Sequence, residues 1–345
     1  MNRLFFLLLT ISAMSMILSC ATAPKQIQRD DPLTGKIINT KTQTEISFDS
    51  LLKDISNYDV IYFSEKHNNP EQHNIQQRII GGLIEKGKAP TIGFEFFAMD
   101  NTPDLLNFVD SGKVAHSKKT DKIIEANLRH KLGWNTQSDE MWQYYFEILT
   151  LAKDKRLQVA GIDLANTLKK RITRKGIKNL TSLEKELIFS TKPPEKEYKD
   201  YMFAIFKAVH CGMGHKKMQS KLYDTWIARN DKMALSITKL YKHCKKPIVI
   251  IIGGGHTEYG LGVIDRVAII DKSIKQVNIS LQEITVELSN LSEYLLPLDI
   301  KGLDKSLPAD YIWFTKRVSY ADPCEEFKKS LKKMRKFTKP KVELP

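Results

Sequence analysis

Residues that can do chemistry follow three separate apolar runs of this chain. They are Glu65 and His67 after the run at 59–63, Glu95 after the run at 91–94, and His256 after the run at 247–252 and three glycines. A carboxylate beside an imidazole suits two kinds of chemistry. It can bind a metal or haem, with the carboxylate fixing the imidazole, or it can perform general acid–base catalysis near neutral pH.

The elements that must position these side chains are expected to be strands. Short apolar runs bounded by turn signals predict buried strands, and helical spacing of apolar residues at 71–86 predicts a helix between the first two. This order predicts parallel strands with a right-handed crossover. Because ligands of open α/β sheets collect outside the carboxyl ends of the strands, residues far apart in the chain are expected to share one cleft. If the extended geometry persists, Glu65 and His67 point to one face.

The rest of the chain is expected to extend this sheet and to cover it with helices. Further strands are predicted at 157–162, ending at Asp163, and at 248–252, 274–286 and 310–315. The segments at 101–150 and 165–245 are expected to be helical insertions rather than a second domain. The predicted fold class is therefore α/β, with a mainly parallel central sheet flanked by helices. One such domain is expected to span residues 48–325.

The first twenty residues have the pattern of an export signal that ends in a lipid-attachment site. A short basic start precedes an apolar stretch of about fifteen residues, too short for an ordinary transmembrane helix. The stretch stops at Cys20 in a sequence that resembles a bacterial lipobox. We expect residues 1–19 to be a signal peptide, Cys20 to be lipidated and residues 20–47 to be a tether between lipid and domain. A plain secretory signal with an incidental cysteine is the alternative.

Composition and charge restrict the classes of molecule that this chain is expected to bind. With 42% hydrophobic and 27% charged residues, the chain has the composition of a globular protein with a core. Ala21, rather than an acidic residue, follows Cys20, which by resemblance to known sorting signals favours the bacterial outer membrane. The formal net charge of +14 suits anionic lipid headgroups. Nucleic acid is excluded as a partner, because a lipid-anchored exported protein does not meet DNA. A basic tail is expected at 326–345.

A second group of candidate ligands lies between two predicted helices. His210 and His215 flank a segment that contains Cys211, a methionine and two glycines. These side-chain types can bind transition metals or haem iron, so the segment is either a ligand-binding insert or a flexible linker with incidental histidines. His73, on the first turn of the helix predicted at 71–86, is either a surface residue or part of the cleft. The sequence leaves both alternatives open.

Three cysteines remain beside Cys20, namely Cys211, Cys244 and Cys324. They have no Cys-x-x-Cys spacing, which argues against a structural zinc cluster. Outside the cytoplasm one pair can be oxidised, and the sequence does not select the pair. The glycines before His256 lack the Lys-Ser/Thr of a phosphate-binding loop and the spacing of a dinucleotide fingerprint.

In their order along the chain, these pieces resemble the ChaN-type haem-binding lipoproteins, within a broader group that includes erythromycin-esterase-like and Tiki/TraB-like proteins. The resemblance covers most of the mature chain. The matching stretches are 60–76 with Glu-x-His and His-x-x-Gln, 92–97 with the strand Glu, 210–215 followed by 231–234, 253–262, and 309–315 with 322–324. Ser64 departs from the pattern, since the usual opening has glycine there. This bears on the loop geometry rather than on the Glu and His.

The resemblance implies a lipid-anchored protein that binds haem or iron and takes part in iron acquisition. It also implies haem held between two subunits, hence a homodimer, with tyrosine ligation. Tyr259 is a candidate for that tyrosine, with Tyr144, Tyr145 and Tyr201 as others. The residues expected to contact haem are Glu65, His67, His73, Glu95, His210, His215, His256 and Tyr259.

The rival interpretation is a hydrolase, metal-dependent or metal-free, of esterase or peptidase type in the same cleft. His67 or His256 would then be the general base or a metal ligand, with Glu65 and Glu95 as partners. No serine nucleophile elbow is visible, which argues against an ordinary serine esterase. A third interpretation is a structural envelope lipoprotein whose site is vestigial. Whether the protein is an enzyme stays open at this level.

Overall fold

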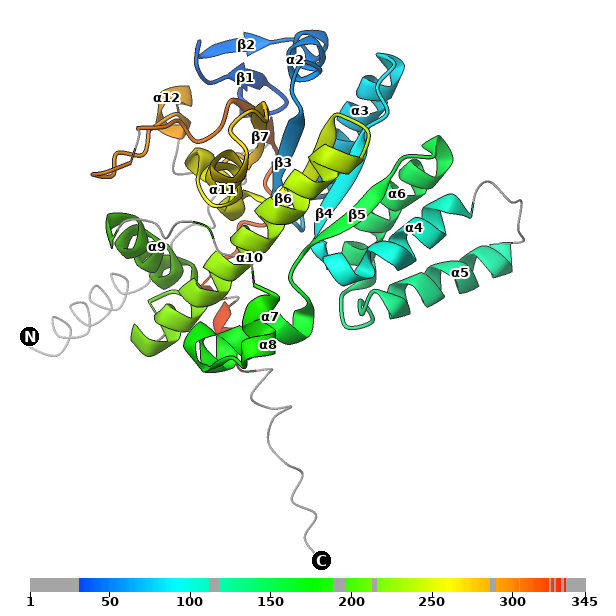
Figure 1. Cartoon of the computed structure of the whole chain (residues 1–345). Helices are drawn as coiled ribbons and strands as arrows, with labels where there is room; N and C mark the ends of the chain where they lie inside the picture. The colour runs from blue at the N-terminus through cyan, green and yellow to red at the C-terminus, as the bar shows by residue number, and fades with distance from the viewer. Residues whose placement is uncertain are drawn as a thin grey trace, which may run out of the picture. The chain divides into compact units, whose positions relative to one another are not determined.

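One eight-stranded sheet organises the unit formed by residues 33–345 (Figure 1). The computed structural model describes residues 31–111, 118–188, 191, 196–212, 216–285, 290–303, 305–322, 324–325, 327–329 and 332. The strands are β1 Ile37–Asn39, β2 Thr44–Ile46, β3 Val60–Glu65, β4 Thr91–Ala98, β5 Val159–Asp163, β6 Ile248–Gly253, β7 Gln276–Glu283 and β8 Tyr311–Thr315. Their order across the sheet is β2-β1-β8-β7-β3-β6-β4-β5.

Most of the pairing in this sheet is parallel. β3 pairs in parallel with β6 and β7, β4 with β6 and β5, and β7 with β8. β1 is antiparallel to both β8 and β2. The mainly parallel α/β sheet predicted from the sequence is therefore confirmed. Across β3 and β6, Glu65 lies opposite Gly253, so these two strands end level with each other.

Helices fill the segments between the strands. They are α2 Phe48–Ile55, α3 Pro70–Glu85, α4 Thr102–Asp110, α5 Lys118–Lys131, α6 Asp139–Lys155, α7 Asn166–Lys175, α8 Ser182–Glu186, α9 Lys196–Val209, α10 Lys216–His243, α11 Val263–Ile270 and α12 Leu291–Tyr294. The predicted helical segment at 101–150 contains α4 to α6, and the one at 165–245 contains α7 to α10.

The central strands are buried on both faces, which explains why their sequences are continuous apolar runs rather than alternating ones. Successive side chains of a strand enter opposite faces of the sheet. Ile61 and Phe63 of β3 join the core that α2, α3 and α6 cover. Val60 and Tyr62 join a second core, which α10 and α11 cover. These two layers of helices fix the positions of the strand ends.

The ordered sheet begins earlier than the sequence indicated. Residues 37–46, which we expected to lie in the lipid tether, form β1 and β2 at one edge of the sheet. Ile37 and Ile38 are buried there, and β1 pairs with β8. Three-residue strands leave almost no sequence pattern, because their stability comes from a partner strand distant in the chain.

Several predictions concern residues outside the described ranges. The signal peptide at 1–19, the lipidated Cys20 and most of the tail at 326–345 fall there, and they stay predictions. Among the described helices, none has the length and the apolar composition needed to cross a membrane.

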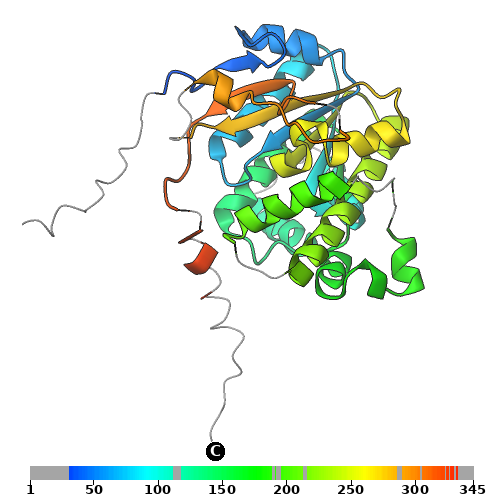
Figure 2. The same ribbon diagram turned by 90° about the vertical axis from the view of Figure 1, so that its left-hand side faces the viewer.

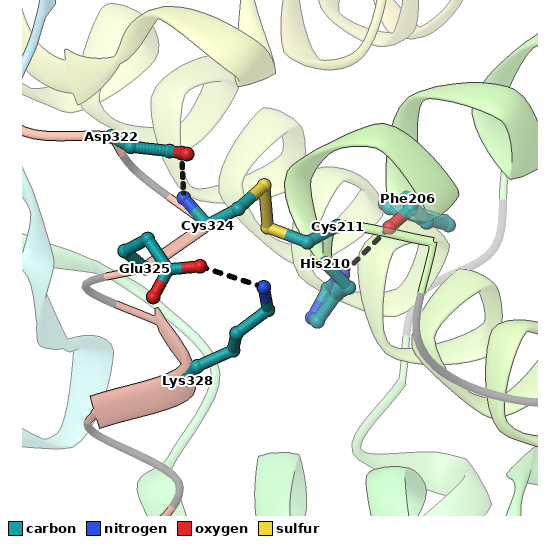
Figure 3. The surroundings of a disulfide bond; sticks show 7 residues. All are labelled: Phe206, His210, Cys211, Asp322, Cys324, Glu325 and Lys328. Carbon is teal, nitrogen blue, oxygen red and sulfur yellow. Dashed lines mark hydrogen bonds and ion pairs between the residues drawn. A yellow bond between two sulfur atoms is a disulfide. The ribbon is translucent and has the colours of Figure 1, made fainter. Parts of the chain in front are cut away.

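One disulfide resolves the cysteine pairing that the sequence left open. Cys211, just after α9, is bonded to Cys324, and Cys244 is free (Figure 3). The segment that follows β8 is thus covalently attached, through Cys324, to the helical insert.

Candidate functional site

A cavity of about 1120 Å³ lies at the carboxyl ends of the central strands. Its wall includes all four side chains that follow the apolar runs, namely Glu65, His67, Glu95 and His256. Glu65 ends β3, Glu95 lies in β4, and His256 closes the 3-10 helix η3 (Gly254–His256) after β6. Since β6 lies between β3 and β4, parallel pairing brings these residues to one edge of the sheet.

The Glu65–His67 pair leaves one imidazole nitrogen without a partner. Nδ1 of His67 lies 2.9 Å from Oε1 of Glu65 and 3.5 Å from the Tyr145 hydroxyl. Among the hydrogen bonds of the described residues, none involves Nε2 of His67. The His67 side chain is 36% exposed, whereas that of Glu65 is fully buried. A carboxylate that accepts the Nδ1 proton leaves the Nε2 lone pair available to a ligand atom.

Glu65 is fixed by further side chains from two helices. Tyr145 on α6 donates its hydroxyl to Oε1, and Gln76 on α3 donates its amide to Oε2. Nδ1 of His73 lies 3.6 Å from Oε2. Burial opposes ionisation of Glu65, but the hydrogen bond from His67 and the attraction of the two histidines outweigh it and hold its pKa below the ordinary value.

The first turn of α3 places His73 against this pair. Asn69 caps the helix through its side chain, and Pro70 occupies the first turn, as expected at a helix start. His73 is buried, and its Nε2 donates to the His67 carbonyl at 2.9 Å. His73 is therefore not a surface residue of the helix, but it is also absent from the described cavity wall. Its side chain supports the loop that carries His67.

In the Glu95–His256 pair both imidazole nitrogens face protein oxygen atoms. Nε2 of His256 lies 3.3 Å from Oε1 of Glu95, and Nδ1 lies 2.8 Å from Oδ1 of Asn230. The ring stacks on Trp226 with centroids 4.4 Å apart and is buried. Unlike His67, this histidine presents no unengaged nitrogen to a ligand.

Arg229 on α10 joins the Glu95–His256 pair to the end of β5. Its Nη2 lies 2.5 Å from Oε1 of Glu95 and 2.9 Å from Oδ2 of Asp163. Lys169 approaches the same Asp163 oxygen at 2.7 Å, and the Gly253 N–H donates to Oε2 of Glu95 at 2.6 Å. Asp163 therefore serves an ion-pair network behind the cavity wall. Sequence reasoning missed Arg229, because nothing in its spacing separates it from the other basic residues of α10.

The surroundings shift the pKa values of the two histidines in opposite directions. Burial disfavours the charged form of His67, but its hydrogen bond to Glu65 and the charge of Glu95 raise its pKa above the ordinary value. For His256, burial is reinforced by Arg229 and exceeds the attraction of Glu95, so its pKa is lowered. Burial also opposes ionisation of Glu95, but His256 and Arg229 hold its pKa well below the usual range.

Two small residues at the strand ends shape the floor of the cavity. A Cβ on Gly253 would lie 2.7 Å from Cε1 and 2.8 Å from Nε2 of His67, so the imidazole needs a glycine beside it. Ser64, where the resembled family has glycine, bonds to Asn278 and Thr257 at 2.5 Å each. The hydroxyl is thus satisfied inside the sheet and leaves Glu65 and His67 in place.

The remaining candidates divide between the cavity and other places. Tyr259 lines the cavity in a left-handed backbone conformation, and burial together with Glu258 raises its pKa. His210 lies at the end of α9, where its Nδ1 donates to the Phe206 carbonyl, and it is absent from the described cavity wall. His215 lies outside the described residues.

Further residues of the cavity wall come from β7, α12, β8 and the segments that follow β3 and β8. The apolar ones include Leu281, Tyr294 and Ile312, and the cationic ones include Lys66 and Arg317. Nζ of Lys66 lies 2.6 Å from Glu283, which also lines the cavity. Thr285 lines the cavity too, and its hydroxyl is buried without a hydrogen-bond partner.

In the described part of the chain, no group of three or more His, Cys, Asp or Glu side chains is arranged to hold a metal ion. The single unengaged nitrogen of His67 suits a metal that arrives with most of its ligands already in place. A metallated macrocycle is such a ligand.

Comparisons with known proteins give the family and the fold of the chain. A family model described as "Haem-binding uptake, Tiki superfamily, ChaN" matches residues 51–267. Among solved structures, ChaN of Campylobacter jejuni with cofacially bound haem is similar at 18% identity and a TM-score of 0.58, covering 84% of this chain and 98% of that one. The type III effector HopBA1 is similar at 12% identity and 0.40, covering 78% and 92%. An erythromycin esterase in its open conformation is similar at 12% identity and 0.40, covering 84% of each. No protein with a curated description matches.

Proposed function

The chain belongs to the ChaN family of haem-binding uptake proteins in the Tiki superfamily, and from this premise we propose that it binds haem in the strand-end cavity and serves iron acquisition. The observation that carries the proposal is the unengaged Nε2 of His67 on the cavity wall. His67 is oriented by Glu65, as metal-binding histidines usually are by a carboxylate. In the proposal His67 would help to hold the haem, with its Nε2 as a nitrogen ligand of the iron.

The rest of the cavity suits the other parts of a haem. Its volume of about 1120 Å³ is sufficient for a cofactor-sized ligand. Leu281 and Ile312 would offer apolar contact to a flat macrocycle, and Lys66 and Arg317 would supply positive charge for its propionates. Haem, when bound, supplies the iron and its redox chemistry. The side chains of this protein bind it and orient it.

Tyrosine is the other candidate ligand, by resemblance to the family. Tyr259 lines the cavity, but its raised pKa works against the phenolate that iron prefers. Tyr145 is buried, and its hydroxyl is committed to Glu65, which together with burial raises its pKa far above the usual value. We rank His67 before Tyr259 on geometry, because Glu65 orients the imidazole and no hydrogen bond of the described residues involves its Nε2; the variants below compare the two.

The proposal includes a lipid anchor at Cys20, a site at the bacterial outer membrane and a homodimer that encloses haem. The Cys211–Cys324 disulfide supports the export part, because structural disulfides persist mainly outside the cytoplasm. Labelling cells with a radioactive fatty acid tests the anchor, with Cys20→Ala as the variant that must lose the label. Sedimentation with and without haemin tests the dimer.

Titration of the purified mature chain with haemin, followed through the Soret band, tests haem binding. We expect saturable binding at one haem per chain. His67→Ala is expected to weaken binding at least about tenfold or to move the Soret maximum, because the axial nitrogen is lost. The matched control is His243→Ala, which removes an exposed histidine at the end of α10. If Tyr259→Phe changes the spectrum and His67→Ala does not, tyrosine ligation replaces histidine ligation.

One observation also favours a hydrolytic function at the same cavity. An imidazole with a free nitrogen, a carboxylate partner and a raised pKa has the form of a general base. Turnover of an ester or peptide panel that is abolished by Glu65→Gln, with His243→Ala unaffected, would establish it. The absence of turnover by the wild-type chain would remove this candidate.

A further inference from the structure

The segment that follows β8 crosses from the sheet to the helical insert. Residues 316–322, here called the strap, leave the end of β8 and run toward the turn after α9 (Figure 2). There the chain is bonded through Cys324 to Cys211 (Figure 3). The strap is thus connected to one part of the molecule by the polypeptide and to another by a disulfide.

The first residues of the strap form part of the cavity rim. The N–H of Lys316 donates to Glu71 at 2.8 Å, and the N–H of Val318 donates to Glu283 at 3.2 Å. Arg317, between them, lines the cavity, as does Glu283. This end of the strap is therefore placed at the wall formed by β7.

The middle of the strap has little to hold it. The hydrogen bonds of Ser319, Ala321 and Asp322 in the described structure are local: Arg317 donates to the Ser319 carbonyl, Ala321 to the Ser319 hydroxyl, and Cys324 to Asp322. Val318 is 39% exposed rather than packed in a core. Segments with few buried contacts open at low free energy, so the covalent bond at the far end governs this one.

The far anchor lies outside the cavity wall but precedes a helix that contributes to it. Cys211 lies in the turn that leads from α9 into α10, and α10 carries Trp226 and Arg229 to the cavity. The bridge joins residues 113 positions apart, and the intervening chain includes β6, β7 and β8. The disulfide therefore closes a covalent ring whose two sides are walls of the same cavity.

We propose that the strap and the Cys211–Cys324 disulfide form a redox-sensitive latch at the rim of the haem cavity. With the bond intact, the strap stays on the rim and slows the release of the ligand; with the bond reduced, the strap detaches and release accelerates. This regulation rests on the proposed haem function. The reductant is a dithiol of thioredoxin type: one thiolate attacks a bridge sulfur, the S–S bond breaks, and the second thiol resolves the mixed disulfide. The bridge gains two electrons and becomes two cysteine thiols, and the reductant is oxidised to a disulfide.

The first test needs no ligand and measures amide hydrogen exchange of the full mature chain. The Lys316 and Val318 amides, both hydrogen-bonded to side chains across the rim, report on the strap. We expect their exchange to accelerate at least tenfold after reduction with a phosphine, while the amides of β3 and β6 keep their protection. Equal protection of the strap amides in oxidised and reduced protein would overturn the latch.

The second test measures release of haemin by transfer to apomyoglobin, after the phosphine has been removed. We expect at least fivefold faster release from reduced protein and from Cys324→Ser, and an unchanged rate from Cys244→Ser, which removes the free cysteine. Release at the oxidised rate from both would overturn the proposal. If Cys324→Ser does not fold, the reduced wild-type chain provides the same comparison. Failure of all forms to bind haemin overturns the proposed function instead, and the exchange experiment still decides whether the strap detaches.

Discussion

The Glu65–His67 pair and the Glu95–His256 pair lie in one cavity, use the same two residue types and differ in what surrounds the histidine. Nδ1 of His67 is paired with Glu65, and its Nε2 has no hydrogen-bond partner among the described residues; the side chain is about one third exposed. His256 is buried, with both nitrogens against oxygen atoms and its face on Trp226. The two Glu–His pairs at similar strand ends thus differ in whether the histidine has a ring nitrogen available to a ligand.

The difference comes from the helices that cover each pair. The Glu65–His67 pair is fixed from behind by Tyr145 of α6 and Gln76 of α3, so its front stays open. The Glu95–His256 pair receives Arg229 and Asn230 of α10 directly. We interpret the first pair as the one that meets the ligand and the second as the support of the wall. Four variants or measurements can break or sharpen that distinction.

The largest effect is expected from Arg229→Ala. The change leaves two buried carboxylates, Glu95 and Asp163, without their shared cation, and breaking such a pair costs about 3 kcal/mol of unfolding free energy or more. Urea denaturation measures the loss. Lys169→Ala is the control, since Asp163 keeps Arg229 in that variant, and about 1 kcal/mol is expected. A loss no larger than that of the control would show that the Glu95–His256 pair does not depend on its cation.

His256→Ala is expected to lower stability more than haemin binding, and His67→Ala is expected to lower haemin binding more than stability. Removal of the buried ring takes away the partner of the Asn230 Oδ1 and should cost about 2 kcal/mol of unfolding free energy. Haemin affinity should change by less than about threefold, which is under 1 kcal/mol. His67→Ala should weaken haemin binding at a smaller cost in stability than His256→Ala, because its ring is partly exposed and Glu65 keeps Tyr145 and Gln76 as partners. Parallel losses of binding and stability in both variants would abolish the distinction.

Gly253→Ala is expected to act on His67 from the neighbouring strand. The new methyl group would lie within 3 Å of two imidazole atoms, so the ring must move, at a cost of about 1–2 kcal/mol. Haemin binding should weaken with it. Gly81→Ala, on α3, is the control, because its Cβ would meet nothing within 4 Å and Gly81 is absent from the described cavity wall. Denaturation and haemin titration of both variants measure the effect. Equal stability and equal haemin affinity in the two variants would show that the His67 ring accommodates the added methyl group.

The smallest effect is the pH dependence of the two rings. His67 should titrate above 6.5 and His256 below it in proton NMR of the imidazole signals. A raised pKa means that the contribution of His67 to stability is present below its unfolded pKa and is lost as pH rises through its folded pKa. His256 has the opposite sign: its contribution is present above its unfolded pKa and is lost as pH falls through its folded pKa. Reversed midpoints would contradict the charge arrangement, and Glu95→Gln should lower the midpoint of His67.

Much of the fold followed from local pattern. The runs that became β3, β4 and β6 are apolar throughout because both faces of these strands are covered, and the family match agrees with the motif order. β1 and β2 escaped prediction because each is three residues long and depends on distant pairing. The residues at strand ends were found because their position is local information. Arg229 and the Cys211–Cys324 pairing were not, because nothing near them in the chain marks them.

The sequence by itself determined the strand ends, the residue types placed there and the resemblance to a haem-binding family. Only the tertiary structure decided which histidine keeps a free nitrogen. A strand end fixes where a side chain starts, through backbone geometry that a few neighbouring residues dictate. What each ring nitrogen touches depends on α3, α6 and α10, which pack across the sheet from distant parts of the chain. Hydrogen bonds and charge pairs across such distances are properties of the packed molecule, and they give the histidines of the two Glu–His pairs different partners.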